Sequence, residues 1–568
     1  MEISRLKAND VSAEDWSRVL VAESFDPASL EECRLEGQVE LSEDVRIARS
    51  RIRNYRIGRG TYIADVTALE CRHESLFGNA TEVATINECG GRTTLIHDQM
   101  TAQTAYMTAL YRHRPQLIER LNALTLAVAE ERKSTMGEVG ENCRLTGARF
   151  LREVRIGNNV EVDGAAILQN GTLLDDVHIG VDVKAYDFIV AQGAHIDNGV
   201  IIERSFVGEA TVMDKNFTTS DSLFFANSHC ENGEAASIFA GPYTVTHHKS
   251  SLLIAGYFSF FNAGSGSNQS NHLFKSGAVH QSIHLRGCKF ASGAYVMSPA
   301  REGAFTMIMG HHSFHHDTQI FPYSYLVERD GKSVLMPGAN LGSYGAVRDV
   351  EKWPRRDKRT VNRDVITFEE YNPYITGQML LAVDALQRME EEDPDAPTYN
   401  YNKVQIRAAS LRRGMTFYNK AIVASLGAML REGQSVARYD GTGRWIDMAG
   451  QLITKREAEA IIEAIESGAL NSFGEIDNRL RVFDVHYTDY AHSWAEEVYT
   501  GLLGHKPTAE ELQDAVTAGE NAHAAMRRTT DADCQRDCSL DMAVGYGIDA
   551  DTEEELRRDY CEVRGLKG

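Results

Sequence analysis

The chain has 568 residues, of which 43% are hydrophobic and 25% charged, with a formal net charge of −22. These values are typical of a globular protein with room for several cores. The negative charge argues against broad nucleic-acid binding, which needs clustered Lys and Arg, and favours a small-molecule partner. No apolar run reaches the length of a membrane span, and the acidic start lacks a secretory signal. We therefore expect no membrane partner and a cytoplasmic location.

Residues 1–36 are predicted as an N-terminal helical segment, and residues 37–97 as the first part of a β-helix. From Val39 to Leu69, aliphatic residues recur at every sixth position, and Arg51 is the one exception. A period of six differs from the 3.6 of a helix and suits a triangular coil, in which each short strand sends one side chain inward. The aliphatic positions are Val39, Val45, Ile57, Ile63 and Leu69.

Residues 98–137 are predicted as a helical insertion into this β-helix. The stretch Met100 to Ser134 has apolar residues at three- and four-residue spacing, which is typical of helix. Pro115 interrupts the stretch, so we expect two helices, with the β-helix resuming near Val139.

The main β-helix is predicted over residues 138–345, where the six-residue grid returns. Three hexads would give a coil of 18 residues, and successive coils would stack about 4.8 Å apart. Gly and Asn near the ends of the hexads supply the positive φ values that corners need. The grid positions are Ile156, Val162, Leu168 and Leu174; the grid then slips by one residue to Ile179 and Ala185, and resumes as Val190, Ile196 and Ile202.

The β pattern ends after VLMPGANLG. Residues 346–364, which contain the basic cluster WPRRDKR, are predicted as a linker, and residues 365–568 as a helical C-terminal domain. The fold class is thus mainly β with α. The pair Cys534 and Cys538 has no second cysteine pair, so a helical turn explains its spacing more simply than zinc.

The most polar stretch, FFNAGSGSNQSNHLFKSGAVHQ, interrupts the β-helix and is the candidate site. Glycines let backbone approach a ligand closely, and its amides and hydroxyls orient a substrate. His280 or His272 is the expected proton-transfer group, since imidazole titrates near neutral pH. The expected substrate-binding residues are Asn262, Ser265, Asn268, Gln269, Asn271, Lys275, Arg301, His229 and His247.

Within this set, an 18-residue coil would stack His229 on His247 and Asn262 on His280. Lys275 and Arg301 would meet an anionic group such as a phosphate. The alternative is an asparagine ladder that closes the corners of the coil, with hydrogen-bonded histidines beside it.

A second cluster, MGHHSFHHD, offers His311, His312 and His315 as zinc ligands. Neighbouring histidines on a strand alternate between its faces, which works against convergence on one ion. A polar rim or an anion-binding surface is the other interpretation.

Two resemblances follow from these patterns. The six-residue grid resembles the left-handed parallel β-helix of the hexapeptide-repeat superfamily, many of whose members are acyltransferases. The phrases NAGSGSNQSNH, KSGAVHQ, SPAREGAF and VLMPGANLG resemble a family of large bacterial β-helix proteins known only as a domain of unknown function. The superfamily resemblance implies a homo-oligomer, with a trimer favoured, but fold does not fix function.

Three functional hypotheses remain open. The leading one is an acyltransferase-like transferase acting on a nucleotide-linked or phosphorylated sugar, with a His base and acyl-CoA as donor. The second is a metal enzyme resembling the γ-carbonic anhydrases, with zinc on the 311–316 histidines. The third is a sugar-binding or assembly protein without catalysis.

Overall fold

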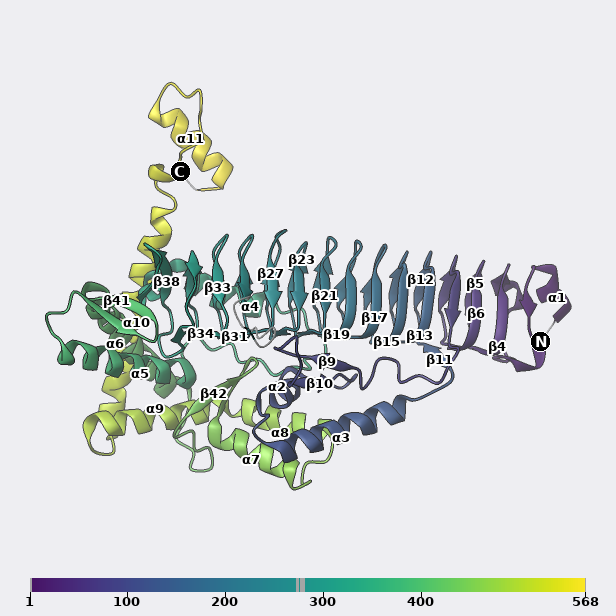
Figure 1. Ribbon diagram of the computed structural model, residues 1–568, viewed down its shortest axis with the longest axis horizontal. Helices are drawn as coiled ribbons and strands as arrows, with labels where there is room; N and C mark the ends of the chain where they lie inside the picture. The colour runs from purple at the N-terminus through teal and green to yellow at the C-terminus, as the bar shows by residue number, and fades with distance from the viewer. Residues whose placement is uncertain (1–2, 272–274, 276–280, 567–568) are drawn as a thin grey trace.

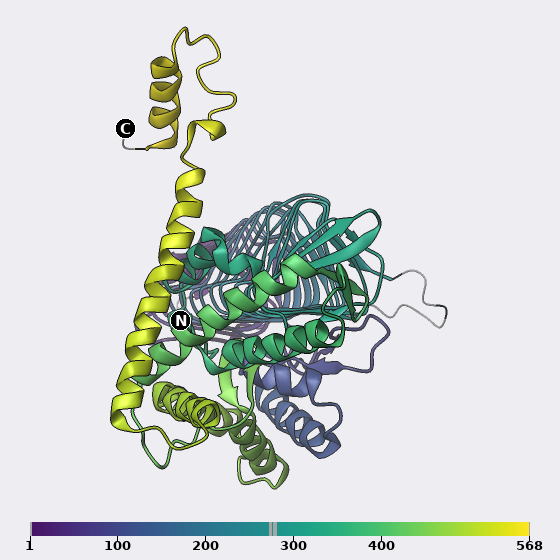
Figure 2. The ribbon, with the colours of Figure 1, turned by 90° about the vertical axis from the view of Figure 1, so that its left-hand side faces the viewer.

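The computed structural model describes residues 3–271, 275 and 281–566. Its body is a parallel β-solenoid that runs along the long axis of the molecule, with helices packed along one side (Figure 1). Viewed along the axis, the coils superpose into one stack (Figure 2). Each regular coil has three faces, which we call the first, second and third face. Within the described residues no helix is both long and apolar enough to cross a membrane.

The solenoid begins in the N-terminal segment. Only α1 (Ile3–Ala8) and two short 3₁₀ turns are helical there, so the helical segment expected at 1–36 is wrong beyond residue 8. Residues after α1 pair in parallel with later coils because their apolar side chains complete the solenoid end. The first strands are β1 (Ser12–Ala13), β2 (Val19–Val21), β3 (Leu30–Glu31), β4 (Arg34–Leu41), β5 (Arg46–Ala48), β6 (Arg51–Ile57), β7 (Tyr62–Ala64) and β8 (Ala68–Glu70).

Longer strands in the middle of the solenoid bend across the corner between the first and second faces. They are β13 (Phe150–Ile156), β15 (Ile167–Leu173), β17 (Lys184–Val190) and β19 (Ile201–Val207). The first face continues with β21 (Thr218–Ser220), β24 (Glu234–Ala236), β27 (Leu252–Ile254), β30 (Asn268–Ser270), β33 (Tyr295–Met297) and β36 (His311–His312). The second face continues with β22 (Leu223–Phe224), β25 (Phe239–Ala240), β28 (Gly256–Phe258), β31 (Ser282–His284), β34 (Ala300–Glu302) and β37 (Asp317–Thr318).

The third face carries the site described below. Its strands after the helical insertion are β12 (Arg144–Thr146), β14 (Glu161–Asp163), β16 (His178–Ile179), β18 (His195–Ile196), β20 (Val212–Asp214), β23 (His229–Glu231), β26 (Val245–Thr246), β29 (Asn262–Ala263), β32 (Lys289–Phe290), β35 (Met307–Met309) and β38 (Tyr325–Arg329). The hairpin partner β39 (Lys332–Met336) ends the stack antiparallel to β38.

The coil repeats after 17 residues in its regular part, not after the 18 expected. Leu151 lies beside Leu168, and Asn170 donates a hydrogen bond to Asp187, 17 residues away. The corner between the first and second faces is a single residue with φ between 40° and 53° at five successive coils, which shortens one side. The five are Glu153, Asn170, Asp187, Arg204 and Asp221.

The predicted interior is confirmed at most grid positions. Ile156, Val162 and Leu168 are at most 1% exposed. The shorter side shifts the next inward position from Leu174 to Leu173, which is fully buried. In the same way Ile52 takes the interior place beside Arg51, which explains the one break in the N-terminal grid.

The helical insertion consists of α2 (Ala102–Leu110) and α3 (Pro115–Arg132), preceded by the hairpin of β9 (Glu82–Ala84) and β10 (Thr93–Leu95). Pro115 begins α3, as predicted. The chain then rejoins the stack through β11 (Gly137–Val139), which pairs directly with β6. The hairpin and α2 pack on aromatic side chains that project from the second face, among them Phe206, Phe239 and Tyr257.

Residues 346–364 are not a simple linker. Their first part belongs to α4 (Tyr344–Arg355), because Ala346 and Trp353 on one side of that helix bury against the body. The remaining residues tie the chain down, since Glu209 accepts backbone N–H bonds from residues 360 to 363.

The C-terminal region is largely helical, with two small hairpins. Its elements are α5 (Pro373–Glu392), β40 (Thr398–Tyr401), β41 (Val404–Arg407), α6 (Ala408–Glu432), β42 (Trp445–Met448), β43 (Gln451–Thr454), α7 (Lys455–Glu466), α8 (Phe473–Val485), α9 (Tyr487–Leu503), α10 (Ala509–Arg536) and α11 (Glu553–Arg564). The α10 helix passes the end of the solenoid and carries α11 away from the body (Figures 1 and 2).

Candidate functional site

A cleft of about 460 Å³ lies on the third face, under α4. The solenoid forms its floor, and α4 with the residues that follow forms its other wall. The hydroxyl of Tyr243 donates to the carbonyl of Trp353 over 2.9 Å, which fixes α4 over the floor. The lining includes His229, Tyr243, His247, His248, Phe260, Asn262, Lys289, Asp349, Lys352, Trp353, Arg356 and Lys358.

The floor is built by strand register. His229, Val245, Asn262 and Lys289 are direct neighbours on successive strands of the third face, so they form one outward column. Adjacent rungs are about 4.8 Å apart. The solenoid thus brings residues far apart in sequence within reach of one small ligand.

Two imidazoles meet at one end of the cleft. The rings of His229 and His247 are 4.3 Å apart between centroids. His229 Nε2 lies 3.0 Å from Glu231, whose pKa is lowered by hydrogen bonds from Lys215 and His229 although burial opposes the shift. Burial, followed by the neighbouring His229, lowers the pKa of His247, so this ring is neutral at neutral pH. A neutral imidazole can accept a proton.

Cations dominate the opposite side of the cleft. Asp349 is 2% exposed and contacts both Lys289 and Lys352, the latter over 2.6 Å. Burial, then the charges of Lys352 and Arg348, lowers the pKa of Lys289 to about 7. Burial, then Arg348 and Arg356, lowers that of Lys352 to about 8. One carboxylate therefore serves several cations, and an anionic ligand would relieve the remaining repulsion.

Three of the predicted substrate-binding residues line this cleft: His229, His247 and Asn262. His229 and His247 lie side by side but do not stack as predicted, because the rung neighbour of His229 is Val245 and the two rings meet edge to face at 62°. The rung neighbour of Asn262 is Lys289, where His280 was predicted. His272 and His280, the expected catalytic residues, lie outside the described residues.

The other polar residues of the predicted site face elsewhere. Gln269 and Asn271 are buried, and Asn271 donates to the carbonyl of Ser298 over 2.7 Å, as the corner-ladder interpretation expects. Asn268 lies on the first face beside Tyr295, and Ser265 is exposed in the turn before β30. The polar run is therefore partly a structural element of the interior.

Neither of the predicted anion-binding cations lines the cleft. Arg301 lies on the second face and pairs with Asp317. Lys275 is exposed. The cations that do line the cleft are Lys289 and those of α4 and its extension, because the register and the docking of α4 bring them to the third face.

The histidines at 311–316 do not converge on one point. His311 and His315 are exposed, whereas His312 and His316 face the interior, as strand alternation predicts. His312 lies 2.8 Å from the hydroxyl of Ser333, and His316 lies 2.7 Å from Glu302. This arrangement gives no support to a zinc site on His311, His312 and His315.

A buried ionic cluster occupies this end of the interior. Glu302 lies between His284 at 2.6 Å and His316 at 2.7 Å, and all three side chains have no exposed surface. The two imidazoles hold the pKa of Glu302 well below its usual range although burial opposes it. Sequence analysis missed this cluster: His284 and Glu302 are rung neighbours 18 residues apart, whereas His316 joins them from only 14 residues beyond Glu302.

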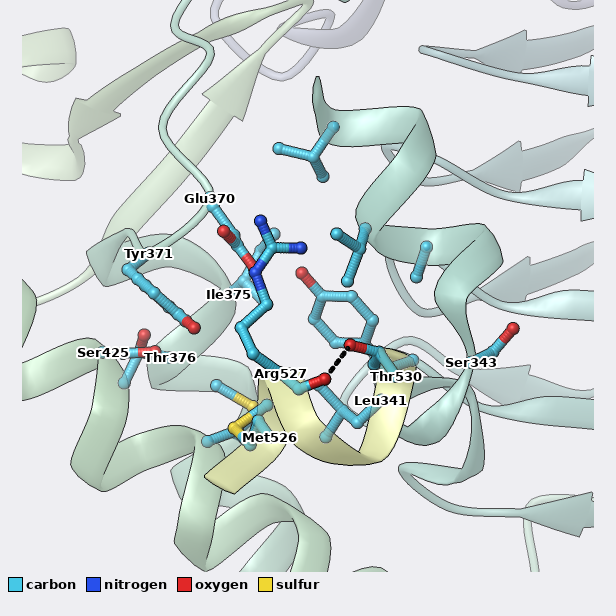
Figure 3. A pocket seen from close by; sticks show the side chains of 16 residues that line it. Leu341, Ser343, Glu370, Tyr371, Ile375, Thr376, Ser425, Met526, Arg527 and Thr530 are labelled. Atoms are coloured by element: carbon cyan, nitrogen blue, oxygen red, sulfur yellow. Dashed lines mark hydrogen bonds between the residues drawn. The ribbon is translucent and has the colours of Figure 1, made fainter. Parts of the chain in front are cut away.

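A second cavity lies between the solenoid end and α4, α5, α6 and α10 (Figure 3). Its wall is mainly apolar, and the guanidinium of Arg527 reaches toward Glu370 (Figure 3). Burial raises the pKa of Glu370. The cavity volume is about 30 Å³, room for a few water molecules, so a sugar does not fit there.

The fold makes this chain a parallel β-solenoid protein with a helical C-terminal region. It belongs to the family described as Domain of unknown function (DUF4954), whose model matches residues 41–390. A second model, Domain of unknown function (DUF6819), matches residues 429–567. The expected membership in a family of unknown function is thus confirmed.

An uncharacterized protein of Treponema pallidum (strain Nichols) is similar to this chain. It is 22% identical over 463 residues, which are 72% of this chain and 63% of the relative. The chain therefore spans less than two thirds of that relative's length.

Proposed function

We propose that the third-face cleft binds a nucleotide-linked or phosphorylated sugar and transfers an acyl group to it from acyl-CoA. The observation that carries this proposal is the pairing of a neutral imidazole, His247, with a group of cations in one cleft. The phosphate would lie against Lys289, Lys352 and Arg356, and Asn262 would orient the sugar.

In the proposed reaction His247 takes the proton of a sugar hydroxyl or amine as that group attacks the thioester carbonyl. The new ester or amide bond forms, the carbon–sulfur bond breaks, and the thiolate of CoA leaves and takes up the proton. His229, held by Glu231, would orient His247 through their ring contact.

Binding is tested by calorimetry with a panel of sugar phosphates and nucleotide sugars. We expect Lys289→Met and Lys352→Met each to weaken binding about tenfold or more, because each removes a charge-assisted contact. Lys332→Met is the matched control, since Lys332 is exposed on the hairpin outside the cleft. Equal affinity in all three variants would refute the site.

Catalysis is tested separately with acetyl-CoA and the ligands that bind. His247→Asn should abolish CoA release while binding stays near the wild-type value, and His315→Asn should leave both unchanged. Binding without turnover in the wild-type chain would instead favour the hypothesis of a sugar-binding protein without catalysis. The excess of cations in the cleft supports that hypothesis equally.

We further propose that the coil winds left-handed, that the chain forms a homotrimer, and that it is cytoplasmic. The handedness and trimer rest on the resemblance to hexapeptide-repeat proteins. Assembly is also supported by apolar side chains on the C-terminal arm after α10, where Val544 is 89% and Ile548 85% exposed. An experimental density map checks the handedness, and cell fractionation checks the location.

The assembly proposal predicts a molar mass of about three chains in light scattering at micromolar concentration. If the arm takes part in assembly, a chain ending at residue 537 should give a molar mass of fewer than three chains. A mass of 63.1 kDa for the full chain would contradict the proposal.

A further inference from the structure

The outward column of the third face continues beyond the cleft toward the N-terminus. Glu161, His178, His195 and Val212 occupy successive rungs, and Val212 is the neighbour of His229. The 17-residue repeat thus places two further imidazoles on adjacent rungs. Their rings stack with centroids 4.2 Å apart and an interplanar angle of 5°.

Asp197 lies beside these imidazoles. One ligand atom from each of His178, His195 and Asp197 lies within 4.8 Å of the other two. We propose that these three side chains bind a zinc-class divalent metal ion on the outside of the solenoid. Two imidazoles and one carboxylate suit Zn²⁺, Co²⁺ or Ni²⁺, and leave positions for water or an external ligand.

The carboxylate is already held in place by the fold. Asp197 Oδ1 accepts backbone N–H bonds from Val181 over 3.0 Å and from Asn198 over 2.6 Å. Its other oxygen, Oδ2, lies 3.9 Å from Nε2 of His195. Because the backbone contacts use one oxygen, the second is left to face the imidazoles.

A further carboxylate orients the first ring. Glu161 Oε2 lies 3.3 Å from Nδ1 of His178. Such a carboxylate–histidine pair fixes a ring and raises its basicity as a ligand. The group therefore has both its ligands and their supporting contacts on adjacent rungs.

Binding requires a small movement of the side chains. Tetrahedral zinc with bonds of about 2.0–2.1 Å brings its ligand atoms to about 3.4 Å from one another. The ligand atoms lie within 4.8 Å of one another here, and Nε2 of His195 is 3.9 Å from Oδ2 of Asp197, so the rings and the carboxylate must close by at most about 1.4 Å. The side chains of His178 and His195 are 27% and 47% exposed, which leaves them room to tilt.

The test uses the full chain after treatment with EDTA, titrated with ZnCl₂ in a calorimeter at pH 7.5. We expect binding of one ion per chain at micromolar concentration, weakened about tenfold or more in His195→Ala and in Asp197→Asn. His315→Ala is the matched control, because His315 is exposed and lies outside the group. Co²⁺ should give the visible absorption of a low-symmetry site in the wild type and lose it in His195→Ala.

Two outcomes would overturn the proposal. One is an affinity for Zn²⁺ in His195→Ala equal to that of the wild type and of His315→Ala, which would place the ion elsewhere among the 19 histidines. The other is the absence of binding at micromolar Zn²⁺ in the wild type. The sugar-transfer assays above do not depend on this result, because His178 and His195 do not line the cleft.

Discussion

At the scale of single residues, the pKa values in this protein are shifted mainly by burial. Asp477 on α8 shows this at the contact between the C-terminal region and the helical insertion. It accepts a hydrogen bond from Thr101, the N-cap of α2, over 3.3 Å. Burial raises its pKa to about 7. The folded protein therefore holds a proton on Asp477 at pH values where the unfolded chain has lost it.

This shift predicts a pH dependence of stability. The pKa of Asp477 is raised from 3.8 to about 7, so its contribution to stability is present below pH 4 and is lost as pH rises to 7. Asp477→Asn removes this pH-dependent contribution to the free energy of unfolding. Relative to the wild type, the variant should gain stability from pH 4.5 to 7 by up to about 1.4 kcal/mol per pH unit.

Urea unfolding at a series of pH values measures the difference. Asp514→Asn, at an exposed position of α10, is the control and should follow the wild-type curve. Parallel curves for Asp477→Asn and the wild type would contradict the assignment.

Val162 provides a residue-scale test of the solenoid interior. Its side chain is fully buried, so Val162→Asp places an unpaired charge among aliphatic side chains. We expect loss of folded, soluble chain in circular dichroism and thermal melting. Val485→Asp, at a position 75% exposed, should melt near the wild-type temperature. A folded Val162→Asp with an unchanged melting temperature would disprove the interior position.

At the scale of elements, α6 and α10 cross with their backbones in close contact. A Cβ added to Gly427 would lie 2.7 Å from the Cα of Gly519. The two backbones meet because neither residue has a side chain at the crossing point.

Gly427→Ala should therefore destabilise the chain by about 1–3 kcal/mol, since the helices must separate. Gly501→Ala on α9 is the matched control, because a Cβ there meets nothing within 4 Å. The control should stabilise by about 0.5–1 kcal/mol through helix propensity alone. Chemical unfolding measures both, and equal effects in the two variants would rule out the close crossing.

At the scale of the whole molecule, Arg286 joins the solenoid to the C-terminal region. Its side chain is 3% exposed, donates to Asp447 over 2.8 Å, and also bonds the carbonyls of Thr367 and Gly450. Its guanidinium lies 4.4 Å from the ring centroid of Phe260, at the edge of the cleft. The guanidinium of Arg286 thus fixes the position of the C-terminal region relative to the solenoid and the cleft.

Arg286→Met leaves Asp447 buried without its partner and should cost about 3–5 kcal/mol. We expect the C-terminal region of Arg286→Met to unfold in calorimetry at a lower temperature than in the wild type, and limited proteolysis to cut between 346 and 372. Arg286→Lys should be intermediate, because it keeps the charge but loses the planar fork. Unfolding of Arg286→Met in one transition at the wild-type temperature would refute this linkage.

The two matching domain models divide the proposed features of the chain. The solenoid strands and α4 that line the proposed cleft lie within the model at 41–390. The C-terminal model at 429–567 begins at the end of α6 and covers the projecting arm. The proposed ligand site and the proposed assembly arm therefore fall in different modules.

Sequence periodicity by itself determined the solenoid, its interior side chains and the break at Pro115. Each of these features follows from a short-range rule. An aliphatic side chain occupies each inward position of the solenoid, and apolar residues at helical spacing are interrupted at Pro115. The same rules predicted 18 residues per coil, because three equal hexads were assumed. The five-residue step from Ala185 to Val190 already marks, in the aliphatic pattern, the side of the coil that is one residue shorter. The same rules did not predict the solenoid strands at residues 12–36, because these strands are short and irregular.

Only the tertiary structure decided the candidate site. His229 and His247 were predicted to meet, and they do, but Lys289, Lys352 and Arg356 join them through register and the docking of α4. Those residues of the polar run that the structure describes are instead distributed over the interior, a turn and two faces. A repeat specifies which side chains point outward. Which of them share one surface column depends on the length of every coil between them. Local sequence patterns do not reveal the total of these coil lengths.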